Sequence, residues 1–261
     1  MAGAILSGMT SCSAPYEWNN IILYDRYKEQ YAPYLDKGVT LAESEAHAAS
    51  LADCVLLATK PQNFPEVLPK LAEVEGIENK LIITIAAGIS TETVSSALGG
   101  AAVVRVLPNT PMLIGMGVTA ACRNEKVSDG DFSFAVSLFE ASGSVLVIDE
   151  SEMNRIISVT SSSPAYVFEF IKAICDGADA QGLDGQSMMA AVCDVVIGSA
   201  TLLKNGLLTT GKTAEEQIRT VASKGGTTER ALASLANEDF DAIIKRAMQA
   251  CTDRADELSR G

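Results

Sequence analysis

The stretch CVLLATKPQ, residues 54–62, joins a short apolar run to a polar turn in which a lysine stands between a threonine and a proline. An apolar run of this length, bounded by turn residues, is typical of a strand that is buried on both faces of a sheet. Similar runs recur at residues 81–86 and 102–107, with amphipathic segments between the runs. This alternation predicts an α/β fold, a doubly wound parallel sheet with crossover helices.

The chain divides into two regions of different texture. Before residue 150 we expect strands at 21–24, 54–58, 81–86, 102–107, 118–121 and 145–148, and helices at 28–37, 64–75, 91–98 and 129–142. After that point every periodic segment is helical, at 153–162, 165–181, 185–205, 213–222, 228–237 and 240–258. The pattern predicts an α/β domain at residues 1–150 and an all-helical domain at residues 151–261.

Composition excludes several classes of protein. The chain has 20 basic and 33 acidic side chains, a formal charge of −13, so its average field repels nucleic acid. Its six cysteines form no C-x-x-C pair, which argues against a metal site and favours reduced thiols in a cytoplasmic protein. Apolar stretches such as residues 81–87 fall short of the roughly 20 residues that span a bilayer, and the N-terminus is not a signal peptide. We expect no nucleic-acid or membrane partner.

Ligands of doubly wound sheets bind beyond the carboxyl ends of the strands. Three loops follow expected strands there. They contain Thr59, Lys60 and Pro61 in the first loop, Ala86, Ala87 and Gly88 in the second, and Asn109 in the third. The first offers a cation, the second a backbone that a flat ligand can approach, and the third a polar side chain between prolines. Each alone reads as an ordinary loop, but together they line one edge.

Asp25 and Arg26 follow the first expected strand, where dinucleotide-binding folds read the adenosine ribose. An acidic residue there favours the 2′-hydroxyl of NAD, and an arginine favours the 2′-phosphate of NADP. Both residue types are present, so the choice of cofactor stays open. A solvated ion pair at a strand end is the competing interpretation.

The helical region holds two further polar segments, SKGGTT at residues 223–228 and TSSSP at residues 160–164. Two glycines followed by two hydroxyl residues at a helix start suit a carboxylate, although a glycine C-cap followed by a threonine N-cap explains them equally well. The serines are turn or cap residues, or face the same cleft. His47 is the only histidine and lies in an exposed-looking helix, so a histidine acid is not expected. A threonine hydroxyl would suffice for a substrate that is readily protonated.

Four motifs carry a resemblance to the pyrroline-5-carboxylate reductase family over essentially the whole chain. They are ATKP at 58–61, RVLPNTP at 105–111, SPAYVF at 163–168 and GGTT at 225–228. The resemblance implies a Rossmann NAD(P)-binding domain, followed by a helical domain that intertwines in a homodimer and often builds larger assemblies. It also implies that NADPH or NADH passes a hydride to the C=N carbon of 1-pyrroline-5-carboxylate, the last step of proline biosynthesis.

The resemblance also assigns roles to individual residues. Thr228 is the catalytic residue and hydrogen-bonds the ring nitrogen of the substrate. The substrate-binding residues are Ser163, Ser223, Gly226, Thr227 and Thr228. The cofactor-binding residues are Ala2, Asp25, Arg26, Thr59, Lys60, Pro61, Ala86, Ala87 and Asn109.

The chain departs from the family pattern in three ways. It begins at the last positions of the Gly-x-Gly-Asn-Met-Ala turn, so the first strand and the glycines before Ala2 are missing. Loss of that central strand would expose two strand edges and remove the amides that hold a pyrophosphate, and a misassigned start codon or an artificially shortened chain would account for it. Ser161 and Ser163 replace glycines, and Lys224 replaces a proline, which opens the question of substrate preference.

Two alternative functions remain at this stage. A β-hydroxyacid-dehydrogenase-like enzyme acting on another imine or a carbonyl would need a catalytic lysine in the helical domain, for which Lys172, Lys204 and Lys212 are candidates. A non-catalytic dimeric paralogue would use only its acidic surface and its helices. The polar residues at cleft positions favour the reductase.

Overall fold

The computed structural model describes residues 1–10 and 16–260, so Cys12 lies outside the described part. The chain forms two compact units. The first comprises Met1–Pro164 together with Ala250–Gly261, and the second comprises Ala165–Gln249. The sequence-based boundary at residue 150 differs from this division, because the start of the helical region and the end of the last helix pack with the sheet.

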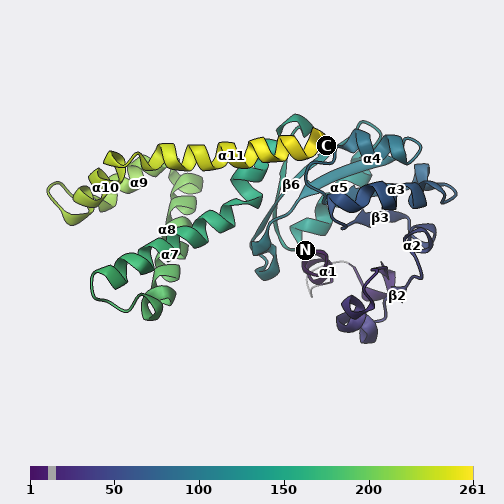
Figure 1. Ribbon diagram of the computed structural model, residues 1–261, viewed down its shortest axis with the longest axis horizontal. Coiled ribbons are helices and arrows are strands. Elements are labelled where there is room, and N and C mark those ends of the chain that lie inside the picture. The colour runs from purple at the N-terminus through teal and green to yellow at the C-terminus, as the bar shows by residue number, and fades with distance from the viewer. Residues whose placement is uncertain (11–15, 261) are drawn as a thin grey trace. The chain divides into compact units, whose positions relative to one another are not determined.

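The first unit is built on a sheet, in which Figure 1 labels β3 and β6. The sheet has five strands in the order β3-β4-β5-β6-β7. The strands are β3 (Cys54–Leu57), β4 (Leu81–Thr84), β5 (Ala102–Leu107), β6 (Gly117–Arg123) and β7 (Gly143–Val147). The first three are parallel, as predicted, but β6 runs antiparallel to β5, and β7 runs parallel to β6. The expectation of an entirely parallel sheet is therefore wrong at β6. Residues 108–116 are too few for the crossover of a dozen or more residues that a parallel connection needs.

A second, two-stranded sheet pairs β1 (Ile22–Leu23) in parallel with β2 (Thr40–Leu41), a strand that the sequence analysis missed. The connection between them, Lys28–Lys37, is a 3₁₀ helix and not the expected α-helix, and Pro33 inside it cannot donate an α-helical hydrogen bond. Within the described residues β1 pairs only with β2, and β3 pairs only with β4.

Helices cover both faces of the large sheet. On one face lie α2 (Glu45–Leu51), α3 (Phe64–Ala72) and α4 (Thr91–Ala97), and on the other lie α1 (Ala2–Met9) and α5 (Asp129–Glu140). Successive residues of a strand point to opposite faces, so Ile82 packs with the first group and Ile83 with the second, and both are fully buried. This double coverage explains the continuous apolar runs that predicted the strands.

The region after β7 begins with α6 (Met153–Ile156) and continues as a π-helix at Ile157–Ser161. The predicted α-helix at 153–162 is therefore interrupted. The remaining helices are α7 (Ser163–Ala180), α8 (Gly185–Thr210), α9 (Ala214–Val221), α10 (Thr227–Asn237) and α11 (Phe240–Arg260). No strand occurs in the described residues beyond β7, as the sequence predicted.

Helix α8 is long and apolar enough to span a membrane, by length and composition only. The expectation that apolar stretches fall short of a membrane span therefore does not hold for α8. Length and composition are weak evidence for a membrane span, because helices that pack against other protein can have the same length and composition. Large apolar side chains on α8 are exposed within the single chain, including Val195 at 65% and Ile197 at 59%.

A close approach between two glycines fixes the pairing of β6 with β7. Gly143 has φ +147°, and a Cβ atom added there would lie 2.0 Å from the carbonyl oxygen of Gly117. We expect Gly143→Ala to lower the free energy of unfolding by about 3 kcal/mol, because the sheet must separate to admit the methyl group. Denaturation in urea measures this loss.

Gly130→Ala is the matched control, since a Cβ atom on Gly130 in α5 meets only the hydroxyl of Ser128 at 3.7 Å. We expect this helical substitution to stabilise the protein by up to about 1 kcal/mol. Equal urea midpoints for the two variants would show that β6 and β7 do not depend on the glycine contact.

Candidate active site

The strand-end loops lie at one edge of the sheet, because β3, β4 and β5 are adjacent and parallel. Thr59 follows β3, and its hydroxyl oxygen is buried without a hydrogen-bond partner in the described structure. Lys60 is exposed and precedes a 3₁₀ helix at Pro61–Asn63. A buried hydroxyl without a partner is costly unless a ligand or ordered water completes its bonding, so Thr59 is a candidate binding residue at this edge.

The loop after β4 is held at its start by a hydrogen bond between its backbone and the side chain of Thr84. The amide of Ala86 donates to the hydroxyl oxygen of Thr84 at 3.2 Å, and Ala86 is 2% exposed. Ala87 packs against a small apolar cluster that includes Leu107 and Met153. Gly88 has φ +78°, a conformation that favours glycine. The loop therefore consists mainly of backbone atoms, with few side-chain atoms that could contact a ligand.

Asn109 follows β5 and is 6% exposed. Its side-chain oxygen accepts a hydrogen bond from the amide of Val118 at 2.9 Å, and its side-chain nitrogen donates to the carbonyl oxygen of Thr160 at 3.0 Å. Both polar atoms thus have partners within the protein. Asn109 therefore connects the start of β6 to the π-helix. Its position in the sequence did not indicate this structural role.

The serine cluster lies at the end of the π-helix. Ser163 is the first residue of α7, and its hydroxyl donates to the carbonyl oxygen of Thr160 at 3.3 Å. The hydroxyl of Ser162 lies 3.3 Å from the sulfur of Cys251. The hydroxyl oxygen of Ser161 is buried and has no hydrogen-bond partner in the described structure. Because π-turns are frequent at functional sites, Ser161 and Ser163 remain candidates for ligand contacts.

Asp25 and Arg26 are exposed and follow β1, which belongs to the small sheet. The carboxylate of Asp25 accepts the amide of Tyr27 at 2.9 Å, which forms a tight turn. Arg26 forms an ion pair with Glu66 of α3 at 3.3 Å. Lys70 and then Arg26 hold the pKa of the Glu66 carboxyl below its usual value. The solvated pair at a strand end is thus formed with Glu66 and not within the Asp25-Arg26 dipeptide. Ala2 is exposed at the first position of α1.

The second unit brings its own predicted residues together in one turn. The amide of Gly226 donates to the carbonyl oxygen of Ser223 at 2.9 Å, and Gly225 has φ +75°. Helix α10 begins at Thr227, and its N-cap is Gly226. Gly226 has no side chain that could accept a hydrogen bond from the first amides of the helix, those of Thr227 and Thr228. Free amides at the positive end of a helix dipole favour an anion. The alternative of a glycine C-cap followed by a threonine N-cap is wrong, because Ala222 is the C-cap of α9 and Gly226 is the N-cap of α10.

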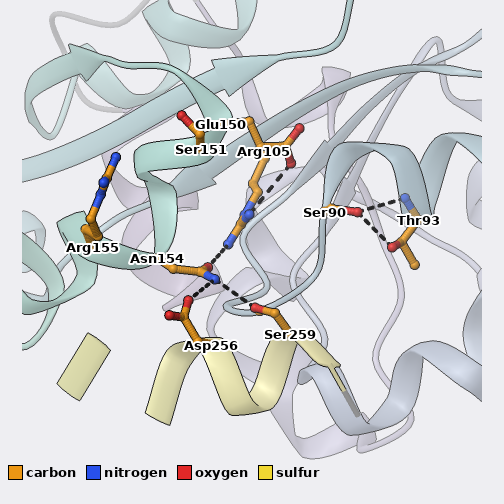
Figure 2. Close-up of a pocket in the computed structure, with 10 residues that line it drawn as sticks. Ser90, Thr93, Arg105, Glu150, Ser151, Asn154, Arg155, Asp256 and Ser259 are labelled. Atoms are coloured by element: carbon orange, nitrogen blue, oxygen red, sulfur yellow. Dashed lines mark hydrogen bonds and ion pairs between the residues drawn. The ribbon is translucent and has the colours of Figure 1, made fainter. Parts of the chain in front are cut away.

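A buried polar cluster escaped the sequence analysis. Arg105 of β5 is 3% exposed and lies 3.6 Å from the carboxylate of Glu150. Burial lowers the pKa of Arg105, and Glu150 opposes that effect. Figure 2 shows both residues in a pocket of about 390 Å³ with Asn154, Asp256 and Ser259. A single charged residue inside the strand sequence AVVRVL was the available signal.

Cys122 of β6 lies beside this cluster. Burial, and then the Glu150 carboxylate, raise the pKa of Cys122 to about 12, so its sulfur is a protonated thiol near neutral pH and a poor nucleophile. Within the described residues no group of three or more histidine, cysteine or acidic side chains could hold a metal ion.

The fold and these loops define a class, the two-domain oxidoreductases with a Rossmann-like domain and a helical domain. Residues 1–88 match the family described as NADP oxidoreductase coenzyme F420-dependent, and residues 150–258 match pyrroline-5-carboxylate reductase dimerisation. The Haemophilus influenzae pyrroline-5-carboxylate reductase is 35% identical over 99% of this chain and 94% of its own length. The Escherichia coli K12 reductase is 32% identical over 100% and 95%. The chain belongs to the pyrroline-5-carboxylate reductase family.

Solved structures agree with this assignment. The Coxiella burnetii pyrroline-5-carboxylate reductase has a TM-score of 0.87 at 28% identity and covers 99% of this chain and 94% of its own. The Streptococcus pyogenes enzyme has a TM-score of 0.86 at 27% identity, with coverage of 98% and 95%. The predicted combination of a Rossmann-type α/β domain with a helical domain is therefore confirmed.

The two hydrogen bonds of Asn109 lead to a test. Asn109→Ala leaves the Val118 amide and the Thr160 carbonyl without partners, so we expect a loss of about 2–4 kcal/mol in the free energy of unfolding. Hydrogen exchange at the Val118 amide should become faster as the free energy of unfolding falls. Asn109→Asp retains the acceptor for Val118 but loses the donor to Thr160, and should therefore keep Val118 protected. Unchanged exchange in the alanine variant would contradict the role assigned to Asn109.

Proposed function

We propose that this protein reduces 1-pyrroline-5-carboxylate to L-proline with NADPH or NADH, the final step of proline biosynthesis. The observation that carries the proposal is the alignment of pyrroline-5-carboxylate reductases with nearly the whole of this chain. The motifs at the strand ends and at the start of α10 lie within the stretch of this chain that those relatives cover. The dinucleotide, when bound, supplies the hydride that adds to the C=N carbon.

We assign substrate binding to the turn that precedes α10. The helix amide at Thr227, which no N-cap side chain covers, and the hydroxyl of Ser223 bind the substrate carboxylate, and the amide of Gly226, which bonds to Ser223 in the structure, turns to the same group. Thr228 hydrogen-bonds the ring nitrogen and holds the proton that the nitrogen carries in the product. A neutral hydroxyl suffices because the imine nitrogen is readily protonated and gains electron density as the carbon accepts hydride. Ser163 borders the ring at the start of α7.

We assign the cofactor to the strand ends of the first unit. The unpartnered hydroxyl of Thr59 and the small residues of the loop after β4, Ala86, Ala87 and Gly88, are suited to a flat, polar ring. The nicotinamide end would be bordered by Thr59, Lys60, Pro61, Ala86, Ala87 and Asn109, and the adenosine end by Ala2, Asp25 and Arg26. In this proposal residues 1–150 bind nucleotide, and residues 151–261 bind substrate and dimerise. Asn109 acts by holding the loop, since its amide atoms have protein partners.

We propose a cytoplasmic homodimer, formed through the helices of the second unit and open to further assembly. Val195, Ile197 and Leu202 of α8 are 59–65% exposed in the single chain, and Phe168 of α7 is 64% exposed. A large apolar surface of this kind on a globular protein is typical of an interface. Residues 150–258, which include α7 and α8, match a dimerisation family, and this match supports an interface in the same region.

Oxidation of NADPH and NADH with pyrroline-5-carboxylate tests the activity. We expect Thr228→Ala to lower kcat/KM roughly 100-fold, because a positioned proton donor contributes at least that factor, and Thr228→Ser to retain most of the activity. Thr220→Ala is the control, since the Thr220 hydroxyl only donates to the backbone of its own helix. No turnover by the unmodified chain, or full turnover by Thr228→Ala, would contradict the proposal.

Sedimentation measures the dimer. Ile197→Asp places a charge on the exposed apolar face of α8, so it should yield monomers at micromolar concentration. The control is Leu51→Asp on α2, where an apolar side chain of similar exposure, 52%, lies in the first unit. If Ile197→Asp sediments as the unmodified protein does, the interface lies elsewhere.

A further inference from the structure

The last turns of α11 pack beside the loop that follows β4. A Cβ atom added to Gly88 would lie 3.3 Å from backbone and side-chain atoms of Leu258. Residues 250–261 belong to the first unit, although α11 begins at Phe240 in the second unit. The end of this helix therefore lies beside Gly88, in the loop of residues 86–88.

One asparagine holds the helix end in place. The side-chain nitrogen of Asn154 donates to the carboxylate of Asp256 and to the hydroxyl of Ser259, at 2.9 Å each. Its side-chain oxygen accepts a hydrogen bond from Arg105 at 3.1 Å. Figure 2 shows Asn154 between Arg105 above and the two α11 residues below. All donors and acceptors of this amide group thus connect α11 to β5.

The same arginine connects to the other end of the loop. Glu150 lies beside Arg105, and its carboxylate accepts the amide of Thr91 at 2.7 Å and the Thr91 hydroxyl. Thr91 is the first residue of α4 and ends the segment that begins at Ala86. The loop is therefore fixed by Thr84 at its start, by Leu258 behind Gly88, and by Glu150 at its end.

The pocket is lined by two basic and two acidic side chains, Arg105, Arg155, Glu150 and Asp256. The guanidinium of Arg105 has Glu150 and Asn154 as partners, although its Nε atom has no hydrogen-bond partner in the described structure. The cluster thus links β5, α11 and residue 150 by hydrogen bonds and an ion pair. It is suited to fixing the position of the elements it connects.

We infer that Asn154 and Asp256 are positioning residues, which use the end of α11 to hold the loop of residues 86–88 against the nicotinamide end of the cofactor. This inference rests on the proposed function, because the loop has a cofactor role only in that proposal. It predicts a selective effect. Loosening the loop weakens binding of the nicotinamide ring and leaves binding of the adenosine end unchanged, since Asp25 and Arg26 lie on a different sheet.

The test compares NADPH with 2′-phospho-ADP-ribose, which lacks the nicotinamide, by fluorescence titration and calorimetry on the full chain. Asp256→Leu removes the acceptor for Asn154, whereas Asp256→Asn retains an acceptor oxygen. We expect Asp256→Leu to weaken NADPH about tenfold, the equivalent of one lost hydrogen bond, and the fragment less than twofold. Asp256→Asn should bind both within about twofold of the unmodified protein, on the same reasoning. Asn154→Leu should reproduce the leucine result.

Glu257→Gln is the control on the same helix, since it breaks only an exposed ion pair with Arg254 and should change neither affinity. Equal weakening of both ligands by Asp256→Leu, or no weakening of either, would overturn the positioning role while the proposed function stands. Failure of the unmodified protein to bind NADPH would overturn the cofactor assignment and this inference with it. If Asn154→Leu does not fold, the two Asp256 variants at the partly exposed helix end decide the matter.

Discussion

The structure depends on the burial of three parallel strands on both faces. Ile82 and Val103 are fully buried against α3 and α4, and Ile83 and Val104 are fully buried against α1 and α5. Each such side chain contributes roughly 1.5–3 kcal/mol when it is removed from water, so the central strands cannot slip in register without exposing that surface. Because β3, β4 and β5 are held in register, their carboxyl ends form a single edge, and the loops that follow them lie together.

Polar side chains within this apolar frame are held by hydrogen bonds and an ion pair. Asn109 bonds through both ends of its amide, to β6 and to the π-helix, and Arg105 pairs with Glu150 and Asn154. Leaving such a buried group without a partner costs about 1–3 kcal/mol, which favours keeping the connected elements together. Among the buried atoms with no hydrogen-bond partner in the described structure are the hydroxyl oxygens of Thr59, Ser142 and Ser161 and the Nε atom of Arg105. Thr59 follows β3 at the strand-end edge, and Ser161 is the last residue of the π-helix.

The helical region follows a different rule. Its amphipathic helices leave large apolar side chains exposed in the single chain, and the turn before α10 leaves helix amides uncapped. Exposed apolar surface is typical of a protein interface, and free amides at a helix N-terminus favour an anion. These two features are the basis of the dimer and substrate assignments proposed for this region.

The sequence by itself determined the order of strands and helices, because apolar runs and helical periodicity are local properties of residues such as those at 54–58 and 81–86. Its motifs also identified the family and the two groups of candidate residues. The tertiary structure alone decided the reversal at β6, the separate sheet of β1 and β2, and the π-helix, because these depend on contacts between segments far apart in the chain. The same holds for Asn109 and Arg105, whose partners at Thr160 and Asn154 lie about fifty residues away in sequence. A hydrogen bond across that distance has no periodicity or spacing that a sequence can display, and only the packed fold brings its two atoms together.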